Sequence, residues 1–129
     1  MPIYLMDKAY RITTGGGVAA NRVVVQGSAA GECILPGGAN ATSILGVTVH
    51  GQSTSGRNVS VRKAGIAEVV ASGAILAGAP VNIHGTTGKV KAITEASGTK
   101  VNVIGFAETP ASADGDVIEV FISIHQRTV

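Results

Sequence analysis

The side chains that could carry chemistry in this 129-residue chain include three widely separated histidines. His50, His84 and His125 belong to no HxH or HExxH pattern, so they could bind a metal ion only if the fold brought them together. His50 and His84 each precede a glycine, which is typical of a strand end beside a turn. We therefore predict no metal site.

Two aspartates and one cysteine are the next candidates. Asp114 and Asp116 flank Gly115 and could touch a calcium ion, but the longer ligand series of a calcium loop is missing, so this pattern indicates a turn. Cys33 has no histidine near it in the sequence and is expected to be a small buried hydrophobic residue. A single cysteine excludes an intrachain disulfide and fits assembly in a reducing cytosol.

Glycine motifs give no sign of a nucleotide site. Gly15-x-Gly17-x-x-Ala20 resembles a dinucleotide fingerprint, but it leads into the valines of residues 23–25 and no acid follows at the required spacing. Gly88-Lys89 lacks the upstream glycine of a phosphate loop. We predict no catalytic residues and no cofactor, and therefore no enzymatic activity.

Composition predicts the elements that surround these residues. Eighteen glycines and many Ser, Thr and Asn residues divide the chain into short segments, which is typical of a small all-β domain. With two Phe, two Tyr and no Trp, the core must consist of Val, Ile, Leu and Ala. The apolar stretch Met1–Met6 is too short for a signal peptide or a membrane span, so no membrane partner is expected.

A unit of strand, polar loop, glycine turn and strand is written twice. Ile44–Thr48 with Gly56–Val61 recurs as Val103–Ala107 with Gly115–Val120, at an offset of 58 or 59 residues through all matching blocks. The sequence predicts a β-sandwich or barrel-like (β-tulip-like) domain, residues 18–129, with similar halves at about 18–70 and 76–124.

Two further expectations concern single segments. Residues 117–124 form the longest predicted strand, with Ile118, Val120, Ile122 and Ile124 facing the core and a polar tail after it. Residues 71–77 could form a turn or one helical turn.

The N-terminal segment differs from the rest of the chain. Residues 1–17 are predicted to be an arm that ends in a flexible joint of three glycines, although residues 8–12 could instead be an ordinary edge strand. An arm of this kind can order on a partner surface. The candidate partner contacts lie in its apolar and basic part: Ile3, Tyr4, Leu5, Tyr10 and Arg11.

Charge is unevenly distributed along the chain, whose formal net charge is +2. Six basic residues stand against two acidic ones up to Lys63, and four basic against six acidic ones from Ala64 onward. This is either a random scatter on solvated faces or a polarised molecule that docks on a charged surface or head to tail. Direct nucleic-acid binding is not expected, because the basic residues are dispersed and aromatic residues are scarce.

The order of glycines and short strands resembles the small decoration (cement) proteins of tailed-phage capsids. The resemblance covers roughly residues 18–124. The matching motifs are Leu45-Gly46-Val47, Gly56, Gly65-Ile66-Ala67-Glu68-Val69, Gly78-Ala79-Pro80-Val81, Gly88-Lys89-Val90, Ile104-Gly105-Phe106-Ala107, Gly115-Asp116 and Val120.

This resemblance implies a compact β-domain that binds the outer surface of a mature capsid and reinforces it against internal DNA pressure. The expected partners are the major capsid protein and further copies of the chain, as a trimer or alternatively a dimer. The expected location is the outer capsid surface of the virion, after assembly in the bacterial cytoplasm. Two other functions stay open: a tail or baseplate component, and a ligand-binding or carbohydrate-binding module, although the missing Trp disfavours sugar stacking.

Overall fold

The computed structural model describes residues 5–129, and this part of the chain consists of strands, turns and loops without helices, as predicted for an all-β domain. No helix within it is therefore long and apolar enough to cross a membrane. The ten strands are β1 (Met6–Ile12), β2 (Val23–Gln26), β3 (Glu32–Ile34), β4 (Ile44–Thr48), β5 (Asn58–Ala64), β6 (Ile66–Val70), β7 (Pro80–His84), β8 (Lys89–Ala92), β9 (Lys100–Ala107) and β10 (Val117–Thr128).

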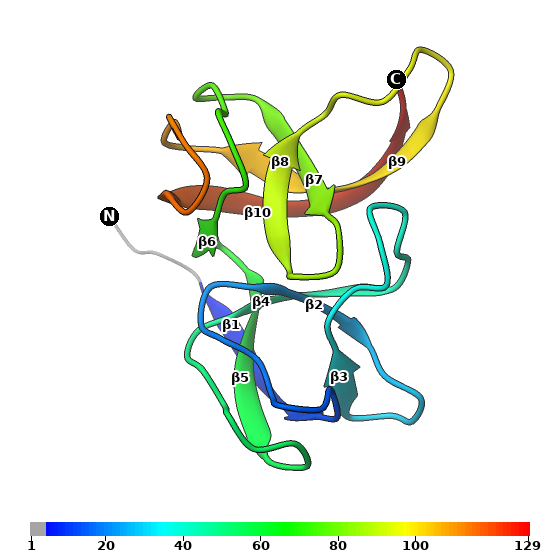
Figure 1. Ribbon diagram of the computed structural model, residues 1–129, viewed down its shortest axis with the longest axis vertical. Helices are drawn as coiled ribbons and strands as arrows, with labels where there is room; N and C mark the ends of the chain where they lie inside the picture. Colours follow the sequence, from blue (N-terminus) through cyan, green and yellow to red (C-terminus); the bar gives the residue numbers. More distant parts are fainter. Residues whose placement is uncertain (1–4) are drawn as a thin grey trace.

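The first five strands form a closed barrel in the order β1-β3-β2-β4-β5. Most neighbours are antiparallel, and the short parallel pair of β1 with β3 completes the ring. Closure removes the unpaired sheet edges that would otherwise invite further strand pairing. Figure 1 shows this half of the molecule below the second half.

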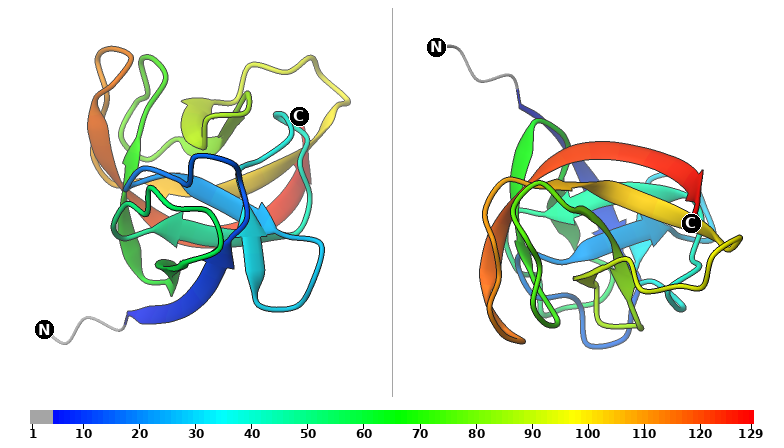
Figure 2. Two further views of the ribbon diagram at one scale, coloured as in Figure 1. Left: turned by 60° about the horizontal axis from the view of Figure 1, so that its bottom comes forward. Right: turned by 90° about the horizontal axis from the view of Figure 1, so that it is seen from above.

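The last five strands form a sheet in the order β6-β10-β9-β7-β8. Its two ends approach each other at a single parallel bridge between Ala71 and Val90, just after β6. If β6 to β10 are matched in turn to β1 to β5, both halves have the same strand order, and this bridge occupies the place of the β1–β3 pair. Figure 2 shows β9 and β10 side by side, in yellow and red.

Backbone hydrogen bonds repeat between the halves at a constant offset. The amide of Ile12 donates to the carbonyl of Arg57 (3.0 Å), and 59 residues later Ala71 donates to Asp116 (2.8 Å). Gly56 and Gly115, also 59 residues apart, have φ angles of 91° and 94° and end equivalent turns. The pseudo-repeat in the sequence thus corresponds to two similarly folded halves.

The boundaries of these halves differ from the predicted ones. Residues 6–12 are not part of an arm, because they form β1, which pairs with β5 along its length and closes the first barrel. Residues 66–70, expected to end the first half, form β6, the counterpart of β1 in the second half. The halves therefore meet at Gly65, between β5 and β6.

The prediction for the last strand was correct in its centre and wrong at its end. Ile118, Val120 and Ile122 are buried, but Ile124 is 42% exposed because the pairing of β10 with β9 shifts between Ile122 and His125. The expected polar tail continues as strand to Thr128. Residues 71–77 contain bends and isolated bridges rather than a helical turn.

Two apolar clusters stabilise the molecule. One fills the first barrel and is built from Tyr10, Ile12, Val18, Val24, Cys33, Val59 and Val61. The larger one lies in the second half and also includes Val23 and Val47 from the first half. Because this second cluster crosses the boundary, the first-half barrel and the second-half sheet share buried surface.

Candidate partner-binding surface

The structure keeps the three histidines apart. His50 accepts a hydrogen bond from the amide of Ser60 (3.2 Å), His84 lies at the end of β7, and His125 stacks on Phe106 at a centroid distance of 5.8 Å. Within residues 5–129, no three His, Cys, Asp or Glu side chains are grouped so that they could hold a metal ion.

The other candidate residues have structural roles. Asp116 accepts hydrogen bonds from the Ser112 amide, the Ser112 hydroxyl and the Ala113 amide, and these bonds lower the pKa of Asp116. Asp114 instead forms an ion pair with Lys89 at 3.0 Å. Burial raises the pKa of the Cys33 thiol to about 11, so this side chain is a neutral core residue. The Gly15–Gly17 segment is a turn that leads to an isolated bridge, not a helix.

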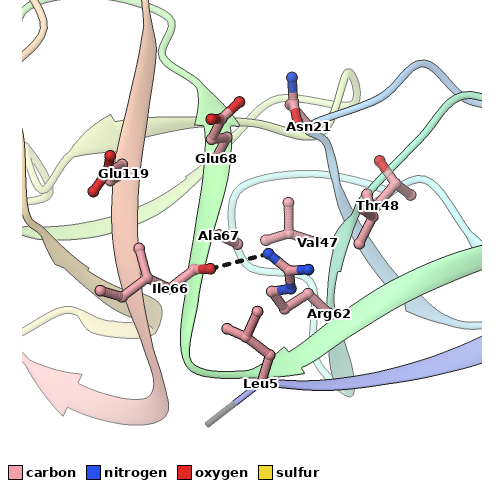
Figure 3. A pocket seen from close by; sticks show the side chains of 10 residues that line it. Leu5, Asn21, Val47, Thr48, Arg62, Ile66, Ala67, Glu68 and Glu119 are labelled. Carbon is pink, nitrogen blue, oxygen red and sulfur yellow. Dashed lines mark hydrogen bonds between the residues drawn. The ribbon is translucent and has the colours of Figure 1, made fainter. Parts of the chain in front are cut away.

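A groove of about 470 Å³ lies where the two halves meet (Figure 3). It is lined by Leu5, Asn21, Val47, Thr48, Val49, Arg62, Ile66, Ala67, Glu68 and Glu119. Strands β4 and β5 supply one wall, and β6 and β10 supply the other. Leu5 and Val49 are partly exposed at 47% and 39%, so the groove offers apolar contact area to a partner.

Arg62 fixes the geometry of this groove. Its guanidinium donates to both carboxylate oxygens of Asp7 at 2.9 and 3.1 Å, and to the carbonyl of Ile66 at 3.3 Å, the dashed line in Figure 3. The hydrogen bond from Arg62 is the main reason that the pKa of Asp7 is lowered. A bidentate pair of this kind is geometrically specific, so it ties β1 and β5 to the start of β6.

Glu68 and Glu119 form an acidic site on the opposite wall. They face each other directly across β6 and β10, and both side chains are exposed. The ion pairs within residues 5–129 involve neither of them. The arrangement can bind a cationic side chain between apolar surfaces.

The predicted contact residues lie in different environments. Ile3 and Tyr4 are outside the described residues. Leu5 lines the groove, whereas Tyr10 is only 4% exposed and packs in the first barrel, so it is not available as an anchor for a partner. Arg11 forms an ion pair with Glu32 at 2.6 Å.

The residues of the second wall carry no motif that predicts a binding site. Ile66, Glu68 and Glu119 belong to motifs that predicted strands, but no spacing rule placed β6 beside β10. The offset of 59 residues is the signal that could have found them. It aligns each of these residues with one on β1 or β5, and the aligned side chains differ in charge and polarity although the backbones are equivalent.

Comparisons with known proteins agree with the architecture. A family model described as phage cement protein matches residues 6–122, which includes strands from both halves. A solved structure, the head fiber gp8.5 N base of bacteriophage phi29, is similar with a TM-score of 0.62 and 18% identity, over 93% of this chain and 95% of that chain. At this identity the likeness shows a shared fold. No curated protein sequence matches the chain.

Proposed function

This chain belongs to the phage cement protein family, a family of structural phage proteins, and on that premise we propose that it binds the outer surface of a mature phage capsid and reinforces the shell against the pressure of the packaged DNA. The observation that carries the proposal is the extent of the family match, from β1 to within β10. The partner is the major capsid protein, and the role requires no catalysis.

The geometry supports a mechanical role. The first half is a closed barrel, the second nearly closes on itself, and a shared apolar cluster joins them, so the body resists shear. Each copy can contact several capsid subunits, and many copies on one lattice gain strength through avidity. The chain is proposed to act as a homo-oligomer, preferentially a trimer, assembled in the cytoplasm of the bacterial host.

A pelleting experiment tests this function. Purified chain is mixed with empty heads of the phage that encodes it. The fraction of chain that pellets with the heads is measured, together with the temperature at which the heads collapse. We expect binding in many copies over the head surface and a higher collapse temperature. Binding in a few copies at one vertex, or binding with no effect on collapse, would instead indicate a tail component or an unrelated module.

A further inference from the structure

The outer faces of the two halves have equivalent backbones but different side chains. On the first half, β1 and β5 present three cross-strand pairs: Asp7 with Arg62, Ala9 with Ser60, and Arg11 with Asn58. On the second half, β6 and β10 present pairs whose members lie 59 residues later: Ile66 with Phe121, Glu68 with Glu119, and Val70 with Val117. We name these last six residues the β6–β10 face.

The first-half face has the chemistry of a solvated surface. Asp7 and Arg62 form an ion pair, and the central pair of Ala9 and Ser60 is small and uncharged. In the second half, the ion pair is replaced by two apolar residues, with Phe121 47% exposed, and Val117 is 52% exposed at the other end. The β6–β10 face is therefore apolar at both ends, around a central acidic pair, on a backbone that in the first half supports a polar surface.

The central pair of the β6–β10 face is unfavourable in the isolated chain. Glu68 and Glu119 are directly opposite each other, and like charges at such positions destabilise a sheet. Arg62 is near enough to Glu68 for the two charges to interact, but the hydrogen bonds of its guanidinium go to Asp7 and the Ile66 carbonyl, not to Glu68. A partner that brings a cation between Phe121 and Val117 would remove this repulsion and cover the apolar residues together.

The chain itself carries a matching surface. In the first half, both acidic residues, Asp7 and Glu32, are held in ion pairs. The charged side chains of this half that are outside these ion pairs are therefore all basic. The Lys8 and Lys63 ammonium groups lie 5.3 and 5.1 Å from the centroid of the Tyr10 ring, and Lys63 also donates a hydrogen bond to the Tyr10 hydroxyl at 2.6 Å. Met6, 61% exposed, precedes Lys8 by two residues on β1, beside a register shift in the pairing of β1 with β5. These residues form a basic and apolar strip: Met6, Lys8 and Lys63.

We propose that the β6–β10 face of one copy binds the strip of Met6, Lys8 and Lys63 on a second copy, head to tail. Such contact joins two different surfaces of the same chain, so it closes into a ring when the rotation between copies allows it. The inference rests on the homo-oligomer of the proposed function, for which it names the interface, and it is independent of capsid binding because it concerns contacts between copies of the purified chain.

Sedimentation equilibrium of the full chain at low and high salt tests the proposal. We expect the wild-type chain to self-associate at low salt, and we expect this association to weaken as added salt screens the charges at the contact. Glu68→Gln with Glu119→Gln should weaken association about tenfold or more. The matched control is Ser53→Lys with Ser55→Lys, which changes net charge by the same amount at exposed loop positions of the first half and should associate as wild type does.

Two further measurements distinguish a role of Glu68 and Glu119 in the contact between copies from a role in the stability of the single chain. The double glutamine variant should melt about 1 to 3 °C higher than wild type at low protein concentration, because repulsion between Glu68 and Glu119 is gone. Lys8→Glu and Glu119→Lys should each associate weakly alone, and a mixture of the two should regain association through the reversed charge pair.

Two outcomes would overturn the proposal. A wild-type chain that stays monomeric at low salt has no such interface. A double glutamine variant that associates like wild type shows that the β6–β10 face does not make the contact, and if that variant also no longer pellets with empty heads, the face binds the capsid protein instead. Failure of wild type to pellet at all contradicts capsid binding and leaves the contact between copies standing.

Discussion

At the scale of single residues, the ion pair of Arg11 with Glu32 has the clearest structural task. Glu32 begins β3, lies opposite Arg11 where β1 and β3 pair, and is almost buried. Its carboxylate also accepts hydrogen bonds from the Ser28 hydroxyl (3.1 Å) and the Ala29 amide (3.2 Å). The hydrogen bond from Arg11 is the largest of the effects that lower the pKa of Glu32.

This shift predicts how barrel stability depends on pH. A carboxyl whose pKa is lower in the folded state contributes stability that is full above its ordinary pKa of 4.5 and is lost as pH falls through the folded value. We expect Glu32→Gln to be less stable than wild type near neutral pH and to approach it in acid. Urea unfolding across this range measures the difference. Glu108→Gln, which removes an exposed carboxylate far from β3 in the sequence, is the control, and a Glu32→Gln deficit that persists undiminished in acid would contradict the argument.

At the scale of the elements, two glycines permit close strand contact in both halves. A Cβ atom added to Gly46 on β4 would lie 2.1 Å from the carbonyl oxygen of Arg62, and one added to Gly105 on β9 would lie 1.9 Å from that of Phe121. Each glycine and each carbonyl lies 59 residues from its counterpart. The glycines that first revealed the repeat are therefore sites where the neighbouring strand leaves no room for a side chain.

Replacing Gly105 by alanine should push β9 away from β10. Because the obstructing atom belongs to the backbone, we expect a loss of about 2 kcal/mol or more in the free energy of unfolding. Chemical denaturation of Gly105→Ala measures this loss. Gly73→Ala is the matched control, since an added Cβ there meets nothing within 4 Å, and equal stability of the two variants would refute the steric explanation.

The sequence predicted the positions of the strands better than it predicted which strands pair with each other. Glycine spacing and alternating valines located most strands and the duplication, because these signals are local. The pattern of β1 hid its role, since only Tyr10 and Ile12 of its seven residues are buried and the rest resemble a solvated arm. The second wall of the groove could not be predicted, because it depends on which strands pair, and pairing is decided by contacts far apart in the chain.

At the scale of the whole molecule, the two halves are joined by more than the Gly65 link. The amide of Val23 donates to the carbonyl of Gly88 (2.8 Å), and the amide of Val70 donates to that of Asn21 (3.1 Å). Val23 and Val47 of the first half are buried in the core cluster of the second. Neither half can unfold without exposing apolar surface of the other, so the two should unfold together.

Intrinsic tyrosine fluorescence makes this cooperativity measurable, because Tyr10 is buried in the first-half barrel, whereas residues 66–129 contain neither tyrosine nor tryptophan. We expect urea transitions followed by fluorescence and by far-ultraviolet circular dichroism to coincide. Val81→Ala creates a cavity in the second half at a fully buried position and should cost about 1 to 3 kcal/mol. If the halves are coupled, this substitution lowers the fluorescence midpoint as much as the dichroism midpoint. If only the dichroism midpoint falls, the two halves unfold separately. The strength of a shell reinforced by this chain would then depend on the weaker half alone.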